Sequence, residues 1–505
     1  MKIPKLPITS DRLPNAGIVF LFLAPLIVFF YASYIFNPAH MGNVFLYSLQ
    51  LIADSISIIT LLGLWLTIFL DVMVLPHHRI HSPETKHGSQ EKVSVDVFIP
   101  TAGESIEILK KTIIAAINIR YPHTTYVLDD AKSFVLEAFC KEIGVTYLTR
   151  KSRKFAKSGN LNNALQFSKA EFFAIFDADQ VAEENFLSVV LPYFQDTELA
   201  MVQTPQFIVN TDNFIAAGSA YAQEIFYRFL SPAKNISDSA FCVGTNVVFR
   251  RKAIEEINGI AEISHSEDIW TSRLLHEKNW KTLFVNQVLA KGTAPETIRS
   301  YFRQQLRWAK GGFGMLFLSN PLTNRNLKLD QRIQYFSANA FYLVGFSILI
   351  YILLPIFYLL FGISSLETGA TLNWLAHYVP YVLLYYSLTW LLLGHIRLPL
   401  IATAMATFYP YILAFFSIVF NTQENWTPTS TQQTDLQIIM HWIWPHVFLI
   451  CLTLVALVVG WFDPTNFWDT AVNSIWAIWN MYLLIMFLTT KKIENHTHLK
   501  NYATH

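Results

Sequence analysis

The stretch that decides the fold is "FFAIFDADQVAEENF", residues 172 to 186. Its first five residues are apolar and predict a short buried strand, and two carboxylates, Asp177 and Asp179, follow at once. Two acids one residue apart often only begin a turn, because Asp is favoured in turns. The alternative is a ligand site at the end of a strand, and the neighbouring segments favour it.

These neighbouring segments alternate between strand and helix patterns. Short apolar strands are predicted at "SVDVFIP", "TYVLDD", "VTYLTR", "FFAIFDAD" and "LAMVQTP", and helical patterns such as "SIEILKKTIIAAINIR" and "GNLNNALQFSKA" separate them. Such alternation predicts an α/β domain whose parallel sheet carries helices on both faces. Ligands of these folds bind beyond the carboxyl ends of the strands, which is where the acids lie.

A second acidic pair, Asp129 and Asp130, ends an earlier strand. Carboxylates gathered at one sheet edge repel one another unless a cation joins them. Mg²⁺ and Mn²⁺ take such oxygen ligands and usually keep phosphate oxygens in their shell. The sequence therefore predicts a divalent cation that binds a diphosphate.

The composition predicts a membrane protein. Of the 505 residues, 53% are hydrophobic and only 14% are charged, which is too apolar for an ordinary soluble chain. A net charge of +1 gives no reason to expect nucleic acid as a partner. The three cysteines are far apart and predict neither disulfides nor a zinc site.

Hydropathy yields seven candidate spans of about 20 residues. Lys and Arg favour the cytoplasmic side of a membrane. The N-terminus, the soluble domain and the C-terminal tail are basic at their membrane edges. They all fall on one side only if 398–420, which contains two prolines, lies in the membrane interface instead of crossing. We therefore predict six spans, and a true seventh span is the alternative. The predicted parts are a transmembrane pair at 1–76, a soluble domain at 77–296, an interfacial amphipathic region at 297–332, and a C-terminal transmembrane region at 333–505.

Three further segments carry candidate site residues. In "KFAKSGNLNNAL", Lys157 at a helix start forms a weak anion site. In "SHSEDIWTSRLL", Glu267 and Asp268 either complement the helix dipole after a capping Ser264 or Ser266, or act as a general base. Spacing alone leaves both functions of this acidic pair open.

The third segment is "TIRSYFRQQLRWAKGG", in which Gln304, Arg307 and Trp308 share one helix face. The same segment has a basic stripe of Arg299, Arg303, Arg307 and Lys310, which a helix lying on the membrane surface would explain. Such a helix gives no reason for Gln304, Arg307 and Trp308 to share a face. Arg can grip a diphosphate with two hydrogen bonds, and Trp offers a platform for a sugar ring.

Together, "LDD", "DAD", "SED" and "QQLRW" resemble the motifs of processive family 2 membrane glycosyltransferases, most closely cellulose synthase catalytic subunits. The flanks "VQTPQF", "VGTNVVFRR", "APET" and "NPL" are similar too. The resemblance implies a GT-A-type, Rossmann-like cytosolic domain inserted in the helical transmembrane domain. It also implies a multi-pass protein of the bacterial inner membrane. The implied partners are a UDP-sugar donor, a growing glycan, the lipid bilayer and accessory export subunits.

The resemblance also implies a role for each matching residue. Thr101, Glu104, Asp129 or Asp130, and Lys157 hold UDP, while Asp177 and Asp179 hold Mg²⁺ or Mn²⁺. Asp268, beside Glu267, is the catalytic base. Gln304 and Arg307 face the diphosphate, and Trp308 faces the acceptor glycan.

Some segments depart from the family pattern. "PTAGE" has Ala102 and Gly103 where Tyr and Asn are usual, and Ser266 replaces the Thr of T-E-D. In the gating-like loop 421–438, Thr429 fits the pattern but Thr431 stands where Lys is expected. A PilZ domain is expected to be absent.

The resemblance favours a processive, inverting synthase that uses UDP-glucose to make a β-glucan. A non-processive enzyme that glycosylates a lipid is the alternative with the same chemistry. A transporter with a regulatory domain is the alternative of another class, and it predicts charged residues within the spans.

Overall fold

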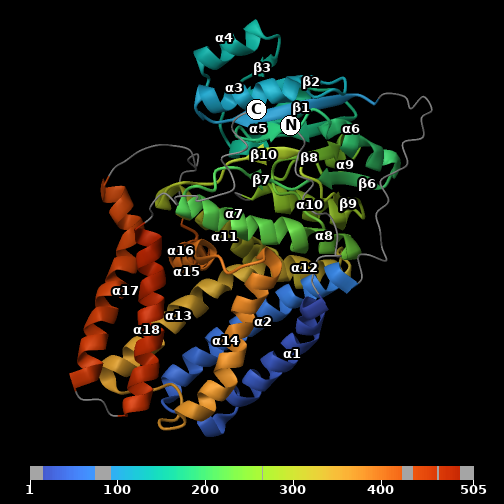
Figure 1. Cartoon of the computed structure of the whole chain (residues 1–505). Coiled ribbons are helices and arrows are strands. Elements are labelled where there is room, and N and C mark those ends of the chain that lie inside the picture. Colours follow the sequence, from blue (N-terminus) through green and yellow to red (C-terminus); the bar gives the residue numbers. More distant parts are fainter. Residues whose placement is uncertain (1–14, 74–92, 264–265, 423–435, 463–465, 490–505) are drawn as a thin grey trace.

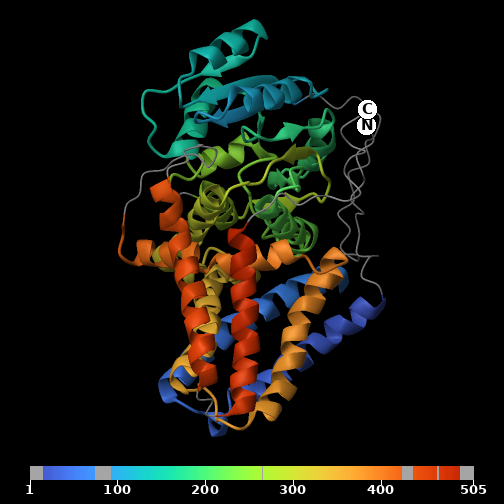
Figure 2. The same ribbon diagram turned by 60° about the vertical axis from the view of Figure 1, so that its left-hand side comes forward.

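The computed structural model describes residues 15–73, 93–263, 266–422, 436–462 and 466–489. It has an α/β part and, beneath it, a bundle of long helices (Figures 1 and 2). The predicted gating-like residues Thr429 and Thr431 lie outside the described residues.

The α/β part is built on a seven-stranded sheet of order β3-β2-β1-β4-β8-β6-β9. Its strands are β1 (Val95–Thr101), β2 (Thr124–Asp129), β3 (Thr146–Leu148), β4 (Phe172–Ile175), β6 (Leu199–Gln203), β8 (Val247–Arg250) and β9 (Lys281–Phe284). Alternate residues of one strand enter opposite cores: Val97 and Ile99 pack on one face, and Phe98 packs on the other. Two covered faces confirm the predicted GT-A-type α/β architecture.

The sheet is mixed rather than purely parallel, because β8 runs antiparallel to both β4 and β6. Val247 at the start of β8 pairs with Ile175 at the end of β4. The loop before β8 therefore reaches the same edge as Asp177. A smaller sheet of β5 (Val181–Ala182), β10 (Ala290–Gly292) and β7 (Phe207–Ile208) extends this edge.

Helices cover the sheet, and two of them, α5 and α10, contribute residues to the carboxyl edge. Those of the α/β part are α3 (Ile106–Ile117), α4 (Phe134–Glu142), α5 (Ala156–Phe167), α6 (Phe186–Val190), α7 (Phe214–Ile225), α8 (Ser231–Ala233), α9 (Arg251–Glu256) and α10 (Glu267–Glu277). Ser105 and Ser133 cap α3 and α4 through their side chains.

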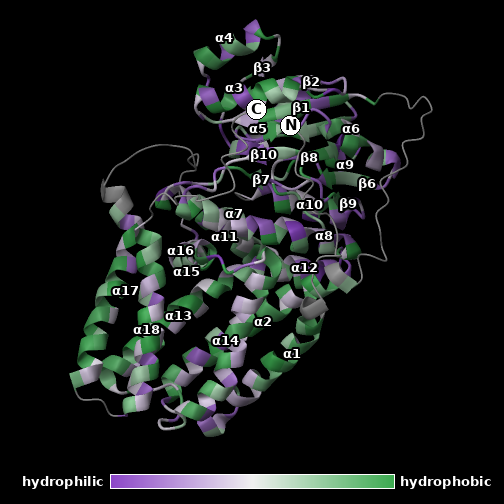
Figure 3. Ribbon diagram, viewed as in Figure 1, coloured by the Kyte–Doolittle hydropathy of each residue, from purple (hydrophilic) through white to green (hydrophobic). Residues whose placement is uncertain are grey.

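The bundle contains α1 (Asn15–Ile35), α2 (Val44–Met73), α13 (Val344–Phe361), α14 (Thr371–Leu393), α17 (Leu436–Phe462) and α18 (Phe467–Leu488). Their residues are largely hydrophobic (Figure 3). Between bundle and sheet lie α11 (Ile298–Leu318), α12 (Leu329–Ala340), α15 (Leu398–Ala406) and α16 (Phe408–Val419).

The number of membrane crossings stays a prediction. Among the described residues, five segments are long and apolar enough to cross a membrane: 44–70, 329–361, 398–419, 440–462 and 467–488. The segment predicted to be interfacial is thus a candidate span by composition, but it is two helices broken at Thr407. The first of them, α15, packs against α7 of the α/β part. This contact favours the interfacial placement.

Some candidate spans contain acids. Asp54 is inside α2 and within the segment 44–70, Asp330 lies within 329–361 and Asp469 lies within 467–488.

Candidate active site

The end of β2 is held together by its own acids. The Asp129 carboxylate accepts the backbone N–H groups of Ala131 and Ser133, both at 2.7 Å, and the Tyr147 hydroxyl at 2.8 Å. Asp130 accepts two hydrogen bonds of 2.7 Å from the Arg150 guanidinium. Both acids therefore stabilise the loop that follows β2. A contact of either acid with UDP remains a prediction.

The end of β1 forms a closed turn. Glu104 accepts the Thr101 hydroxyl at 2.5 Å and the Ala102 N–H at 2.8 Å. Gly103, with φ +115°, occupies a backbone conformation that favours glycine. Thr101 pairs in register with Asp129, so the ends of β1 and β2 lie side by side.

Lys157 connects three elements at the edge. Its ammonium forms an ion pair with Asp177, donates to the Gly244 carbonyl at 2.7 Å and lies 3.9 Å from Glu267. Burial acts against its charge, but Asp177 and Glu267 hold the pKa of Lys157 above its ordinary value. The sequence-predicted anion site thus lies directly beside the predicted metal site.

Asp179 lies beside the same cluster. It accepts the Thr293 hydroxyl at 2.8 Å and the Gln180 amide at 3.4 Å. Burial and then the charge of Asp177 raise the pKa of Asp179, so a cation between the two acids would relieve a real repulsion.

Within the described residues, no three His, Cys, Asp or Glu side chains gather closely enough to hold a metal by themselves. Two carboxylates still fit a cation whose remaining ligands come from water and a diphosphate.

Asp268 is half-buried in the first turn of α10. Burial and the neighbouring Glu267 raise the pKa of Asp268 to about 7, while the Ile269 N–H, Lys157 and Arg307 act in the opposite direction. Ser266 makes no side-chain cap to α10. A carboxylate with a pKa near 7 is better suited to act as a general base than to cap a helix.

The helix α11 presents the predicted trio on one face. Gln304, Arg307 and Trp308 are half-buried, while Gln305 turns inward and accepts the Tyr411 hydroxyl at 2.9 Å. The Gln304 carbonyl oxygen is buried and has no hydrogen-bond partner within the described part of the chain. A Cβ at Gly311 would overlap the Ser266 side chain, so glycine lets α11 approach the start of α10.

Sequence reasoning missed the loop before β8. A Cβ at Gly244 (φ +91°) would lie 3.3 Å from the Lys157 ammonium and 3.5 Å from the Asp268 carboxylate. The Thr245 hydroxyl accepts the Asp177 N–H at 2.9 Å. "VGTNVVFRR" was noted only as a family flank, since its strand direction is invisible in the sequence. Thr293 was missed for a similar reason, because it reaches Asp179 only through the small sheet.

The acids, Lys157 and the candidate base Asp268 lie at the carboxyl edge of this sheet, and Arg307 of α11 lies near Asp268. This arrangement suits a GT-A-type glycosyltransferase. Comparison with known proteins shows which families the chain resembles. Residues 93–311 match a family described as "Glycosyltransferase like family 2", and residues 254–398 match one described as "Cellulose synthase". The chain is therefore similar to family 2 glycosyltransferases and, among them, to cellulose synthase catalytic subunits.

Two curated relatives show the extent of the similarity. The UDP-forming cellulose synthase catalytic subunit of Pseudomonas fluorescens (strain SBW25) is 31% identical over 426 residues, covering 79% of this chain and 56% of that protein. The corresponding subunit of Xanthomonas axonopodis pv. citri (strain 306) is 34% identical over 261 residues, covering 50% and 36% respectively. The chain thus spans about half or less of the length of these two relatives.

A solved structure supports the fold. A mannosyltransferase from Pyrobaculum calidifontis, in complex with GDP-mannose and Mn²⁺, matches with a TM-score of 0.53 at 14% identity. The match covers 74% of this chain and all of that one. At this identity the likeness concerns the fold alone.

Proposed function

We propose that the chain is an inverting, processive glycosyltransferase that polymerises a UDP-sugar, UDP-glucose first, into a β-glucan and exports it through its spans. The observation that carries the proposal is Asp268, a half-buried carboxylate that lies near Lys157 at Gly244 and has a pKa of about 7. The relatives named as UDP-forming cellulose synthase subunits support the donor.

Asp268 accepts the proton of the acceptor hydroxyl as that oxygen bonds to the anomeric carbon of the donor sugar. The bond from this carbon to the diphosphate oxygen breaks at the same time, so UDP departs and the configuration inverts. Asp268 suits this task because its pKa is near neutral pH. A base of this kind is deprotonated in a large fraction of molecules and is still basic enough to accept the proton.

Charge on the departing UDP would be met by the cations of the site. Arg307 would hydrogen bond the diphosphate, and Lys157 would approach it from α5. A Mg²⁺ or Mn²⁺ ion between Asp177 and Asp179 would neutralise part of the diphosphate charge. The half-buried Trp308 would stack on the newest sugar of the acceptor.

In this proposal the α/β part is cytosolic and the helices lie in the bacterial plasma membrane. The test supplies purified protein with labelled UDP-glucose, UDP-N-acetylglucosamine and UDP-glucuronate in separate reactions, and digests any product with linkage-specific glycosidases. We expect glucose incorporation into a β-glucanase-sensitive polymer, which Asp268→Asn lacks. No incorporation from any of the three donors would overturn the proposal.

A further inference from the structure

A buried ion pair joins the loops that follow β2 and β3. The Arg150 guanidinium donates two hydrogen bonds of 2.7 Å to the Asp130 carboxylate, and the two side chains are only 8% and 7% exposed. Two parallel hydrogen bonds fix the plane of a guanidinium as well as its position. The ion pair therefore determines where the other contacts of Arg150 lie.

These other contacts are with the backbone just before α5. Arg150 donates to the Lys154 carbonyl at 2.7 Å and to the Ala156 carbonyl at 2.6 Å, so it binds the chain on both sides of Phe155. A Cβ at Gly159 would overlap both the Arg150 guanidinium and the Lys154 carbonyl. Glycine near the start of α5 therefore leaves the space that the guanidinium occupies.

The backbone that Arg150 binds has an unfavourable conformation. Phe155 (φ +61°) and Ala156 (φ +43°) both lie in the left-handed region, which residues with a side chain rarely adopt. Phe155 is the N-cap of α5, and its side chain makes no capping hydrogen bond. Strained residues of this kind persist only where the surrounding groups hold them. Arg150 holds them through the carbonyls of Lys154 and Ala156.

Lys157 directly follows the two left-handed residues, so their conformation sets the direction in which its side chain leaves the backbone. The Lys157 ammonium forms an ion pair with Asp177 and donates to the Gly244 carbonyl at 2.7 Å. The Arg150 side chain is too buried to contact a sugar donor, and its nitrogens already bind Asp130 and the backbone. Arg150 therefore acts on the site through Lys157.

We propose that Arg150 is a positioning residue that holds residues 154–156 and thereby orients Lys157 toward Asp177 and the diphosphate of the donor. The inference rests on the proposed function in that this diphosphate belongs to the UDP-sugar. A lysine at position 150 would keep the positive charge opposite Asp130. Its single ammonium lacks the planar fork that binds the carboxylate and both carbonyls together, so Lys157 would turn away from Asp177.

The test compares Arg150→Lys with the parent, both as purified full-length protein in detergent. The first measurement uses no nucleotide: mass spectrometry follows the acetylation of Lys157 by acetic anhydride, with the exposed Lys110 as the internal reference. We expect Lys157 to react several-fold faster in Arg150→Lys, because the ion pair with Asp177 protects the ammonium in the parent. The second measurement is UDP binding in the presence of Mn²⁺, by calorimetry. The affinity should fall about tenfold, as for the loss of one charged hydrogen bond.

Gly159→Ala is a second variant, and it leaves every charge in place. Its methyl group would displace the Arg150 guanidinium from the Lys154 carbonyl, so we expect the same two changes. This variant keeps the inference testable if Arg150→Lys does not fold.

A double-mutant cycle separates a positioning role from a merely structural one. If Arg150 acts through Lys157, then Arg150→Lys should cause no further loss of UDP affinity in a Lys157→Ala background. A merely structural role would produce the same loss in both backgrounds.

Arg250→Lys is the matched control. Arg250 donates to the carbonyls of Leu199 at 2.9 Å and Phe194 at 2.8 Å, and it lies at the amino end of β4, on the edge of the sheet opposite the site. The substitution removes contacts of the same kind. It should lower the melting temperature and leave both UDP affinity and Lys157 acetylation unchanged.

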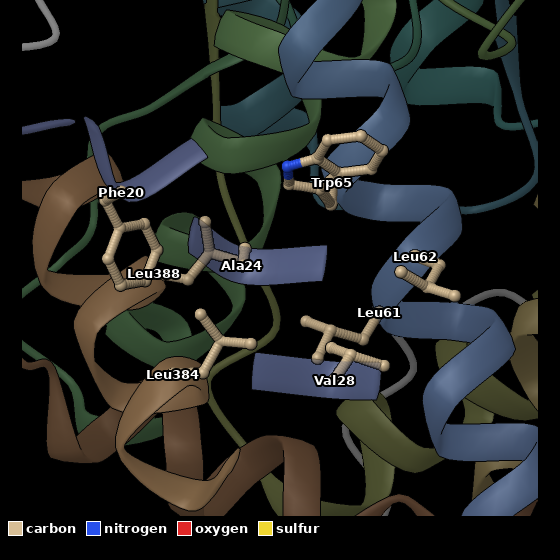
Figure 4. A pocket seen from close by; sticks show the side chains of 8 residues that line it. All are labelled: Phe20, Ala24, Val28, Leu61, Leu62, Trp65, Leu384 and Leu388. Atoms are coloured by element: carbon tan, nitrogen blue, oxygen red, sulfur yellow. The ribbon is translucent and has the colours of Figure 1, made fainter. Parts of the chain in front are cut away.

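Leu384→Ala is a control for a loss of stability in the bundle. Leu384 lines an apolar cavity together with Val28 and Leu61 (Figure 4). Truncation of a buried leucine enlarges the cavity and destabilises the fold. UDP affinity and Lys157 acetylation should again be unchanged.

Unchanged Lys157 acetylation together with unchanged UDP affinity in Arg150→Lys and Gly159→Ala would overturn the inference. An equal loss of affinity with and without Lys157 would also overturn it. Failure of the proposed function gives a different result. If the parent protects Lys157 through Arg150 but does not bind UDP, the positioning role stands and the proposed donor is wrong. Polymer synthesis from UDP-glucose with no effect of Arg150→Lys on Lys157 would do the reverse.

Discussion

At the scale of residues, the chemistry depends on how neighbours tune a few buried charges. The pKa of Asp268 reflects opposing neighbours. Burial and Glu267 raise this pKa, while Lys157 and Arg307 lower it. Lys157 stays charged although it is half-buried, since the nearby carboxylates of Asp177 and Glu267 raise its pKa. Each group is explained by its partners rather than by its residue type alone.

The raised pKa of Asp268 predicts a pH-dependent rate. A general base works only when deprotonated, so kcat/KM should fall as the pH drops through about 7, the pKa of Asp268. The measurement is a pH profile of initial rate at low UDP-sugar concentration. Asp268→Asn should lose about a hundredfold or more in rate and keep its affinity for UDP. A flat profile between pH 5 and 8 would contradict this role.

Asp179 provides the test of the metal. Asp179→Ala should abolish Mg²⁺- or Mn²⁺-dependent UDP binding, measured by calorimetry, because one of two carboxylate ligands is lost. The control Asp196→Ala removes an acid that pairs with Lys281 on the surface, and it should leave binding intact. Full activity of the parent enzyme in excess EDTA would argue against any metal at this site.

At the scale of elements, α11 joins the site to the bundle. The charge of its Arg307 acts on the Asp268 carboxylate, while its Phe302 packs against His446 and Phe487 of α17 and α18. Gly311 sets the distance between α11 and the start of α10.

Gly311→Ala tests this close approach. In an open helix the change would stabilise by about 1 kcal/mol, because Ala is the better helix former. Here the added methyl group overlaps Ser266, so we expect α11 to shift and kcat/KM to fall about tenfold or more. Ser266→Gly removes the overlapping atoms, and the double variant should recover activity relative to Gly311→Ala. An active single variant, or no recovery, would contradict this account of Gly311.

The sequence predicted the elements better than their contacts. Apolar strands ending in acids were sufficient to place Asp177 and Asp179 on one edge, because parallel strands share their carboxyl ends. The antiparallel direction of β8 was not predictable, since it depends on where the chain returns after a long excursion. Gly244 and Thr245 were missed for that reason. The internal bonds of Asp129 and the burial of Asp54 within the helix bundle likewise depend on side chains distant in sequence.

At the scale of the whole molecule, the α/β part is seated on the bundle through α11, α12, α15 and α16. A Cβ at Gly218 on α7 would overlap the Thr403 side chain on α15, so these helices are in close contact. Contact of this kind is expected of an interfacial helix and not of one that leaves the α/β part to cross the bilayer.

Cysteine labelling tests that topology. With Cys451 replaced by Ser, single cysteines at Ile396 and Phe420, both exposed, should share one side of the membrane if 398–420 does not cross it. A cysteine at the exposed Leu372, at the start of α14, should lie on the other side. The measurement uses a membrane-impermeant thiol reagent on intact cells and on inverted vesicles. Opposite labelling of positions 396 and 420 would establish the seventh span.

The central claim is that one molecule extends one polymer and retains it between transfers. The most direct measurement is the length of the product when labelled UDP-glucose is scarce relative to enzyme. We expect long β-linked chains on a small fraction of molecules. In Trp308→Ala we expect shorter chains with continued UDP-glucose hydrolysis, because the indole is proposed to hold the newest sugar. A one-sugar lipid product as the sole labelled species would contradict the account and identify a lipid glycosyltransferase.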